Sequence, residues 1–215
     1  HPQHRRQRQM CIRDRYNDGN GSNSGHVRIY ENTSGSMWTK LGSDIDGEAA
    51  GDYSGRGVSL SSDGSRVAIG AINNDGNGSN SGHVRVFEYQ VISGTATWTQ
   101  LGQDIDGEAE SDESGSSISL SSDGSRVAIG AVVNDGGGHV RIYDYNGSAW
   151  VQVGGDIDGE AAGDQSGSSV SLSSDGSRVV IGATGNDAGN ASSDNRGHVR
   201  IYDYNGSAWV QVGAD

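Results

Sequence analysis

The stretch Ser119–Val127 reads SLSSDGSRV, and it decides the class of fold. The same nine residues recur at 59–67 and 171–179, so the copies are 60 and 52 residues apart. Asp-Gly at the centre of each copy is a strong turn signal. Serines alternate with apolar residues before this turn, and a Val/Ile-rich run follows it. Short apolar runs between turn signals are typical of an all-β protein.

The repeat extends on both sides of this stretch and has room for four strands. In the third copy we expect strands at about 116–121, 126–133, 139–145 and 149–153, with a linker over 156–167. A tryptophan recurs at positions 38, 98, 150 and 209, and a His-Val pair starts at 26, 83, 139 and 198. A unit of 52–60 residues with four short antiparallel strands has the size of one β-propeller blade.

The repeat count predicts a propeller fragment of about three and a half blades. The sequence divides into a half-blade at 16–45 and blades at 46–105, 106–157 and 158–215. A closed propeller has at least about four blades. We therefore expect an open arc whose partners include the remaining blades of a full-length chain.

Residues 1–15 differ in composition from the rest of the chain. They hold the one proline, the one cysteine and five arginines, but no glycine or serine. The run Met10–Arg15 resembles translated adapter sequence, and the alternative is a genuine basic tail. We predict a non-native or disordered leader here and leave it out of the blade count.

The charge excludes some classes of function. The formal net charge is -13, and an acidic surface disfavours nucleic acid, whose phosphates need Lys and Arg. No apolar run is long enough to span a bilayer. A single cysteine allows no disulfide within the chain. No nucleophile elbow, phosphate loop or Cys/His metal spacing is present, so the sequence predicts no enzyme.

Three recurring motifs resemble the FG-GAP repeats of integrin α-chain propellers and related surface proteins. The entry to the inner strand stands here as Ser54-Gly55, Ser114-Gly115 and Ser166-Gly167, and a Gly-Ala pair follows at 70, 130 and 182. Gly51-Asp52 and Gly163-Asp164 precede two of the entries. The resemblance covers 16–215 and implies an extracellular or cell-surface location. The integrin calcium loop does not carry over, because the turn between the two motifs is too short to hold it.

The linkers between blades carry the candidate metal ligands. Their carboxylates follow the spacing 1, 3, 5 and 9, which resembles the oxygens of a Ca²⁺ loop. The alternative is a solvated acidic turn whose side chains bind nearby backbone amides. The candidate ligands are Asp44, Asp46, Glu48, Asp52, Asp104, Asp106, Glu108, Asp112, Asp156, Asp158, Glu160 and Asp164.

The repeated His-Val-Arg segments are expected to serve the structure rather than chemistry. Each histidine starts the third strand of a different blade, so the histidines lie far from one another and a structural role is expected. The arginine after each pair is expected to be solvated or to partner a charge on a neighbouring strand.

The leading functional prediction is a secreted or cell-surface binding and adhesion module. It would present acidic, Gly/Asn-rich loops on one face to a protein or glycan ligand, with the help of calcium. One alternative is a propeller-fold hydrolase or lyase whose catalytic residues lie in the missing blades. The other is an intracellular scaffold propeller. A singular blade rich in His, Glu or Arg would favour the enzyme.

Overall fold

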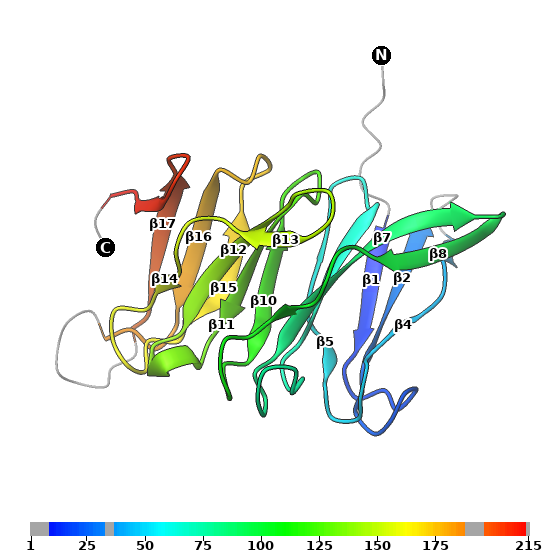
Figure 1. Ribbon diagram of the computed structural model, residues 1–215, viewed down its shortest axis with the longest axis horizontal. Coiled ribbons are helices and arrows are strands. Elements are labelled where there is room, and N and C mark those ends of the chain that lie inside the picture. The colour runs from blue at the N-terminus through cyan, green and yellow to red at the C-terminus, as the bar shows by residue number, and fades with distance from the viewer. Residues whose placement is uncertain (1–8, 33–36, 188–195, 214–215) are drawn as a thin grey trace, which may run out of the picture.

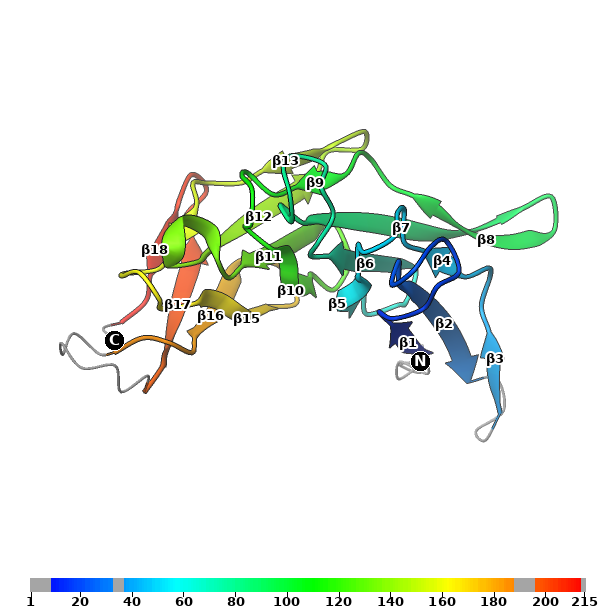
Figure 2. The ribbon, with the colours of Figure 1, turned by 90° about the horizontal axis from the view of Figure 1, so that it is seen from below.

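The computed structural model describes residues 9–32, 37–187 and 196–213, and in these it is an all-β protein. Its 18 strands form four antiparallel sheets that stand side by side along an open arc (Figures 1 and 2). The one helical element of the described ranges is the 3-10 turn η1 (Asn134–Gly136), and none of their helices could cross a membrane. The prediction of an all-β propeller fragment is confirmed.

Each sheet is a simple up-and-down arrangement of consecutive strands, and in the first three sheets a two-residue strand from the linker that follows pairs with one of them. The first sheet contains β1 (Gln9–Asp14), β2 (His26–Asn32), β3 (Trp38–Lys40) and β4 (Ile45–Asp46). The second contains β5 (Ser54–Leu60), β6 (Arg66–Ala71), β7 (His83–Ile92), β8 (Thr95–Gln100) and β9 (Ile105–Asp106). The third contains β10 (Ser114–Leu120), β11 (Arg126–Ala131), β12 (His139–Tyr145), β13 (Trp150–Gln152) and β14 (Ile157–Asp158). The fourth contains β15 (Ser166–Leu172), β16 (Arg178–Ala183), β17 (His198–Tyr204) and β18 (Trp209–Gln211).

The repeated Asp-Gly turn sets the register of the two inner strands of a sheet. In the third sheet Asp123 Oδ1 accepts hydrogen bonds from the Ser125 amide at 3.0 Å and the Ser121 hydroxyl at 2.8 Å. The bond from the Ser125 amide is the main reason why the pKa of Asp123 is lowered. The turn then pairs Leu120 with Val127 at the start of the β10–β11 ladder. The residue after the aspartate of each turn (Gly64, Gly124 and Gly176) has a positive φ of about 70°. Glycine adopts this backbone conformation without strain.

Neighbouring sheets approach most closely at their inner strands, and two glycine motifs meet there. A Cβ at Gly70 would stand 2.3 Å from the carbonyl oxygen of Gly115, and one at Gly130 would stand 2.2 Å from that of Gly167. The Gly-Ala pair of one sheet therefore faces the Ser-Gly entry of the next. The backbones touch at this point, so no side chain fits between them.

The outer strands are joined by the repeated tryptophans. Trp98, Trp150 and Trp209 each donate the indole N–H to a carbonyl oxygen near the end of the preceding sheet, at 2.8, 2.7 and 2.9 Å. Trp150 is 3% exposed. Each tryptophan thus fixes the outer edge of its own sheet to the sheet before it.

The hydrophobic core lies between the sheets and is divided by them. Between the second and third sheets, Val127 and Ile129 of β11 pack against Ala68, Val84 and Val86. A corresponding cluster lies on each side of this one. Apolar residues on both faces of the second strand of a sheet are explained by this stacking, since each face meets a different neighbour.

The prediction of a disordered leader over 1–15 is wrong for residues 9–14. These residues form β1, which pairs with β2 from Gln9–Glu31 to Asp14–His26. Cys11 packs against the core of the first two sheets, whereas Met10 and Ile12 are 38% and 41% exposed. The free edge of β2 offers unpaired backbone groups, which any extended segment can satisfy. Residues 1–8 lie outside the described ranges, and the adapter origin of the segment stays a prediction.

Candidate functional site

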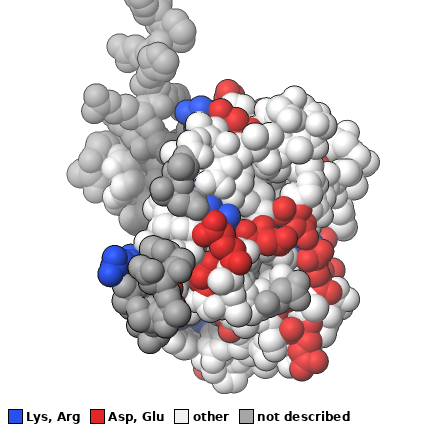
Figure 3. Space-filling model, turned by 90° about the vertical axis from the view of Figure 1, so that its left-hand side faces the viewer, with Lys and Arg blue, Asp and Glu red and all other residues white. Residues whose placement is uncertain are grey.

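The loops at one end of the blades form a continuous surface, which we call the loop face. It consists of residues 17–25, 44–53, 74–82, 104–113, 132–138 and 156–165. Asn20 and Asn77 hold it together, because each side-chain amide donates to two carbonyl oxygens of the following linker at 2.8–2.9 Å. Acidic side chains gather on the side of the molecule where the fourth sheet lies (Figure 3).

The fourth carboxylate of each linker anchors the turn. Asp112 is 3% exposed and accepts hydrogen bonds from the amides of Glu108 at 2.9 Å and Ala109 at 2.8 Å. Asp52 and Asp164 are equally buried and make the same kind of bond. Each also accepts a bond from an asparagine that follows the second strand of its sheet, Asn74 at 3.2 Å and Asn186 at 3.0 Å. Hydrogen bonds to nearby backbone amides are what the alternative of an acidic turn predicts at this position, although these carboxylates are buried and not solvated.

The first carboxylate of each linker binds side chains of its own sheet. Asp44 forms ion pairs with Arg28 and Lys40, and hydrogen bonds from these side chains lower its pKa although burial, the largest influence, opposes them. Asp104 and Asp156 accept from Gln100 at 2.6 Å and from Gln152 at 2.5 Å.

The second carboxylate of each linker stands at the end of a two-residue strand, and an arginine of the next sheet binds the backbone of that strand. The backbone carbonyls of Asp46, Asp106 and Asp158 accept hydrogen bonds from Arg85, Arg141 and Arg200 at 2.7–2.8 Å. The repeated arginine therefore binds a backbone carbonyl in the neighbouring unit, a contact that no pattern in the sequence indicated.

The third carboxylate of each linker lies close to the histidine of the next sheet. Glu48, Glu108 and Glu160 place an oxygen 3.9, 3.7 and 3.6 Å from Nδ1 of His83, His139 and His198. The Asp104 carboxylate reaches His83 Nδ1 from the other side, also at 3.9 Å. The four carboxylates of one linker are thus divided between two sheets.

Three groups of side chains on the loop face could hold a metal ion. Their potential ligand atoms lie within 4.8 Å of one another in each case. They are His26, Asp44 and Asp46; Glu48, His83 and Asp104; and Glu108, His139 and Asp156. The histidines lie far apart, as expected, but each stands with two linker carboxylates, which for His83 and His139 come from two successive linkers. The common spacing of histidine and linker along the repeat was the signal that could have revealed the groups.

Burial disfavours the charged form of the His83 and His139 imidazoles. It lowers the pKa of His83 to about 4, and Arg85 acts in the same direction while Asp104 opposes it. The pKa of His139 is lowered for the same reasons. Burial raises the pKa of Glu48, against the effect of Arg85.

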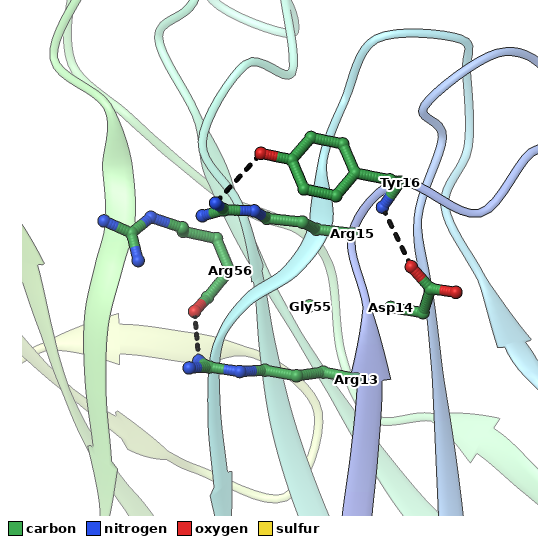
Figure 4. A pocket seen from close by; sticks show the side chains of 6 residues that line it. All are labelled: Arg13, Asp14, Arg15, Tyr16, Gly55 and Arg56. Carbon is green, nitrogen blue, oxygen red and sulfur yellow. Dashed lines mark hydrogen bonds between the residues drawn. The ribbon is translucent and has the colours of Figure 1, made fainter.

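A separate pocket of about 440 Å³ lies beside β1 and β5 and is lined by Arg13, Asp14, Arg15, Tyr16, Gly55 and Arg56 (Figure 4). The Arg13 guanidinium donates to the Arg56 carbonyl at 2.6 Å, and Arg15 donates to the Tyr16 hydroxyl at 3.0 Å. Half of these residues belong to the segment 1–15, whose composition separates it from the repeat. The pocket is therefore no feature of the blade and supports no function for it.

The family of the repeat follows from a match to a family model. Residues 44–87, which contain the second sheet's inner strands, match the model described as FG-GAP repeat. This stretch is an FG-GAP repeat. The FG-GAP resemblance predicted from the Ser-Gly and Gly-Ala motifs is confirmed there. No curated protein sequence matches the chain.

Solved structures with similar architecture include two candidate 6-phosphogluconolactonases. One, from Bacteroides uniformis, has 13% identity and a TM-score of 0.59, and the match covers 89% of this chain and 51% of that one. The other, from Bacteroides fragilis, has 12% identity and a TM-score of 0.54, with coverages of 98% and 56%. The chain spans about half the length of these proteins. At this identity the likeness shows the fold alone.

These neighbours correct the leading functional prediction. The sequence favoured an adhesion module and predicted no enzyme, because its repeats are nearly identical and no catalytic motif stands out. The two solved proteins compared above, which share the fold, are described as candidate lactonases and not as adhesion modules. The error arose because a catalytic motif need not lie within the repeat: half of the length of such proteins has no counterpart here.

Proposed function

We propose that this chain is part of a propeller hydrolase that opens the internal ester of a sugar-acid lactone. The observation that supports it most is the shared fold with two candidate 6-phosphogluconolactonases over 89% and 98% of the chain. The described sheets repeat the same side chains at the same positions. The loop face contributes the surroundings in which the substrate binds.

The charge of the loop face specifies the substrate further. Each linker carries at least four carboxylates, and the chain has a formal net charge of -13. A surface of one sign repels ligands of the same sign and attracts those of the opposite sign. We therefore propose an unphosphorylated lactone as the substrate, in contrast to the phosphorylated one named for the structural neighbours.

Hydrolysis of a lactone requires a base for the attacking water. Water adds to the carbonyl carbon, a proton passes to the base, and the ring C–O bond breaks as its oxygen takes up a proton. Carboxylates at the loop face are groups of the right type. Glu48, Glu108 and Glu160 are each about 43% exposed, so substrate can reach them.

Base uptake at constant pH with a panel of lactones tests this function. We expect glucono-δ-lactone to open faster than its spontaneous rate, and faster than the phosphorylated lactone by about tenfold at low salt. The triple variant Glu48→Gln, Glu108→Gln, Glu160→Gln should reduce this preference. A control with Glu110→Gln and Glu113→Gln, an exposed and a half-buried residue of one linker, should reduce it less. Failure of the protein to open any lactone would contradict the proposal.

Calcium as the bound ion remains a proposal. It is supported by the carboxylate oxygens that the linkers repeat, since Ca²⁺ prefers oxygen ligands. Thermal unfolding in calcium and in chelator tests it, together with the double variant Asp156→Asn, Asp158→Asn. Superimposable curves for the unmodified protein would remove calcium from the linkers.

An extracellular location also remains a proposal, supported by the FG-GAP repeat at 44–87. Finding the protein in the culture medium or on the cell surface of its source would support it, and finding it confined to the cytosol would oppose it.

A further inference from the structure

His83 is a buried polar side chain without a partner. It is 1% exposed, and neither ring nitrogen forms a hydrogen bond with any of the described residues. A buried polar atom that loses water and gains no partner costs about 1–3 kcal/mol. Nearly all buried polar groups in folded proteins are paired, so such a residue calls for an explanation.

The unpaired Nδ1 atom faces two carboxylate oxygens. Glu48 Oε2 and Asp104 Oδ2 each lie 3.9 Å from it, which is too long for a hydrogen bond. The three ligand atoms lie within 4.8 Å of one another. Three atoms at this separation, with an imidazole nitrogen at the bottom, leave space for an ion between them.

The distances fit a small ion after a modest adjustment. A zinc ion binds nitrogen and carboxylate oxygen at about 2.0–2.2 Å, which places two tetrahedral ligands about 3.4 Å apart. Each carboxylate would have to move inward by about half an ångström. The side chains of Glu48 and Asp104 are 43% and 32% exposed, so they are free to move and leave a route for an ion from solvent.

The ligand types select the class of metal. Imidazole suits Zn²⁺, Cu²⁺, Ni²⁺ and Fe²⁺, whereas Ca²⁺ takes six to eight oxygens. We propose that Glu48, His83 and Asp104 bind a divalent transition-metal ion such as Zn²⁺, with water completing its coordination. Arg85 does not prevent this, because its Nη1 lies 3.4 Å from Oε1 of Glu48 and leaves Oε2 for the ion.

The ion would join three segments that are distant in sequence. Glu48 comes from the linker before the second sheet, His83 from the start of β7, and Asp104 from the linker after that sheet. Binding only to the folded arrangement stabilises it. The site shares Glu48 with the surface proposed for the hydrolase, but metal binding and stability are measured separately from lactone opening, so the two proposals can fail separately.

The metal-depleted protein titrated with Zn²⁺ and with Ca²⁺ provides the test, followed by calorimetry and by thermal unfolding. We expect Zn²⁺ to raise the unfolding temperature and to bind at least about tenfold more tightly than Ca²⁺. Glu48→Gln and Asp104→Asn each preserve shape and lie at the solvent edge, so both variants should fold. Each should weaken Zn²⁺ binding at one site by about tenfold or more.

Asp106→Asn is the matched control, because it removes the same charge from an exposed position two residues from Asp104. It should keep the Zn²⁺ response, which separates coordination from general attraction. His83→Gln tests the buried ligand where the variant folds. The proposal is overturned if Glu48→Gln and Asp104→Asn bind Zn²⁺ like the unmodified protein, if the control loses binding equally, or if Ca²⁺ binds this group as tightly as Zn²⁺.

Discussion

Replacement of Gly130 by alanine should separate the third and fourth sheets. The added Cβ would stand 2.2 Å from the carbonyl oxygen of Gly167 and 2.5 Å from the hydroxyl of Ser117. The serine can rotate away, but the carbonyl belongs to the backbone of β15. The inner strands of the two sheets must therefore move apart by about 1 Å to restore ordinary contact distances.

The expected cost is at the upper end of that for overpacked cores. Extra atoms in a well-packed core cost about 1–3 kcal/mol, and a backbone clash between two sheets leaves little room for relaxation. We therefore expect a loss of about 3 kcal/mol. For a chain of this size, that lowers the unfolding temperature by about 6–12 °C.

Two other glycines serve as controls. Gly182 has the same position in the fourth sheet, where the atom nearest to an added Cβ would be the Ser169 hydroxyl oxygen at 2.5 Å. Gly182→Ala should cost about 1 kcal/mol or less, because a hydroxyl can turn away. A Cβ at Gly155 meets nothing within 4 Å, so Gly155→Ala should lie within about 0.5 kcal/mol of the unmodified protein. Urea unfolding of the three variants measures the differences. If Gly130→Ala and Gly155→Ala unfolded at the same urea concentration, the close contact between sheets would be wrong.

Three further outcomes are expected. Trp150→Ala, which removes a side chain that is 3% exposed, should cost about 3–5 kcal/mol in urea unfolding, whereas Trp38→Ala, at 43% exposure, should cost about 1 kcal/mol or less. Asp112→Ala should cost about 2 kcal/mol, because it leaves the part-buried amides of Glu108 and Ala109 without their acceptor. A cost no greater than that of the exposed control Glu110→Ala would contradict this role. Burial raises the pKa of Cys11 to about 12. Its thiol should therefore react with a disulfide reagent at pH 8 at least about 100-fold more slowly than in the urea-unfolded chain. Equal rates would show that β1 does not pack against the core of the first two sheets.

Local signals in the sequence were sufficient for the strands. The Asp-Gly turn at 123–124 and the alternation of Ile118 and Leu120 with serines predicted two antiparallel strands, which β10 and β11 confirm. Turn chemistry and side-chain alternation act over a few residues, so a sequence displays them directly. The repeat of these signals then predicted the propeller.

Longer-range contacts could not be read in the same way. The sequence grouped Asp44, Asp46, Glu48 and Asp52 as ligands of one ion because they are close along the chain. The fold divides them: Asp44 and Asp46 stand with His26, Glu48 crosses to His83, and Asp52 binds backbone amides. It also pairs residues 9–14 with β2, although their composition set them apart.

The sequence by itself determined the four main strands of each repeat, their turns and the number of repeats, because each depends on interactions between neighbours in the chain. Only the tertiary structure decided which carboxylate meets which histidine. That depends on how one sheet stacks on the next: the backbone contact between the glycine pairs sets this stacking, and it brings Glu48, His83 and Asp104 together from positions up to 56 residues apart.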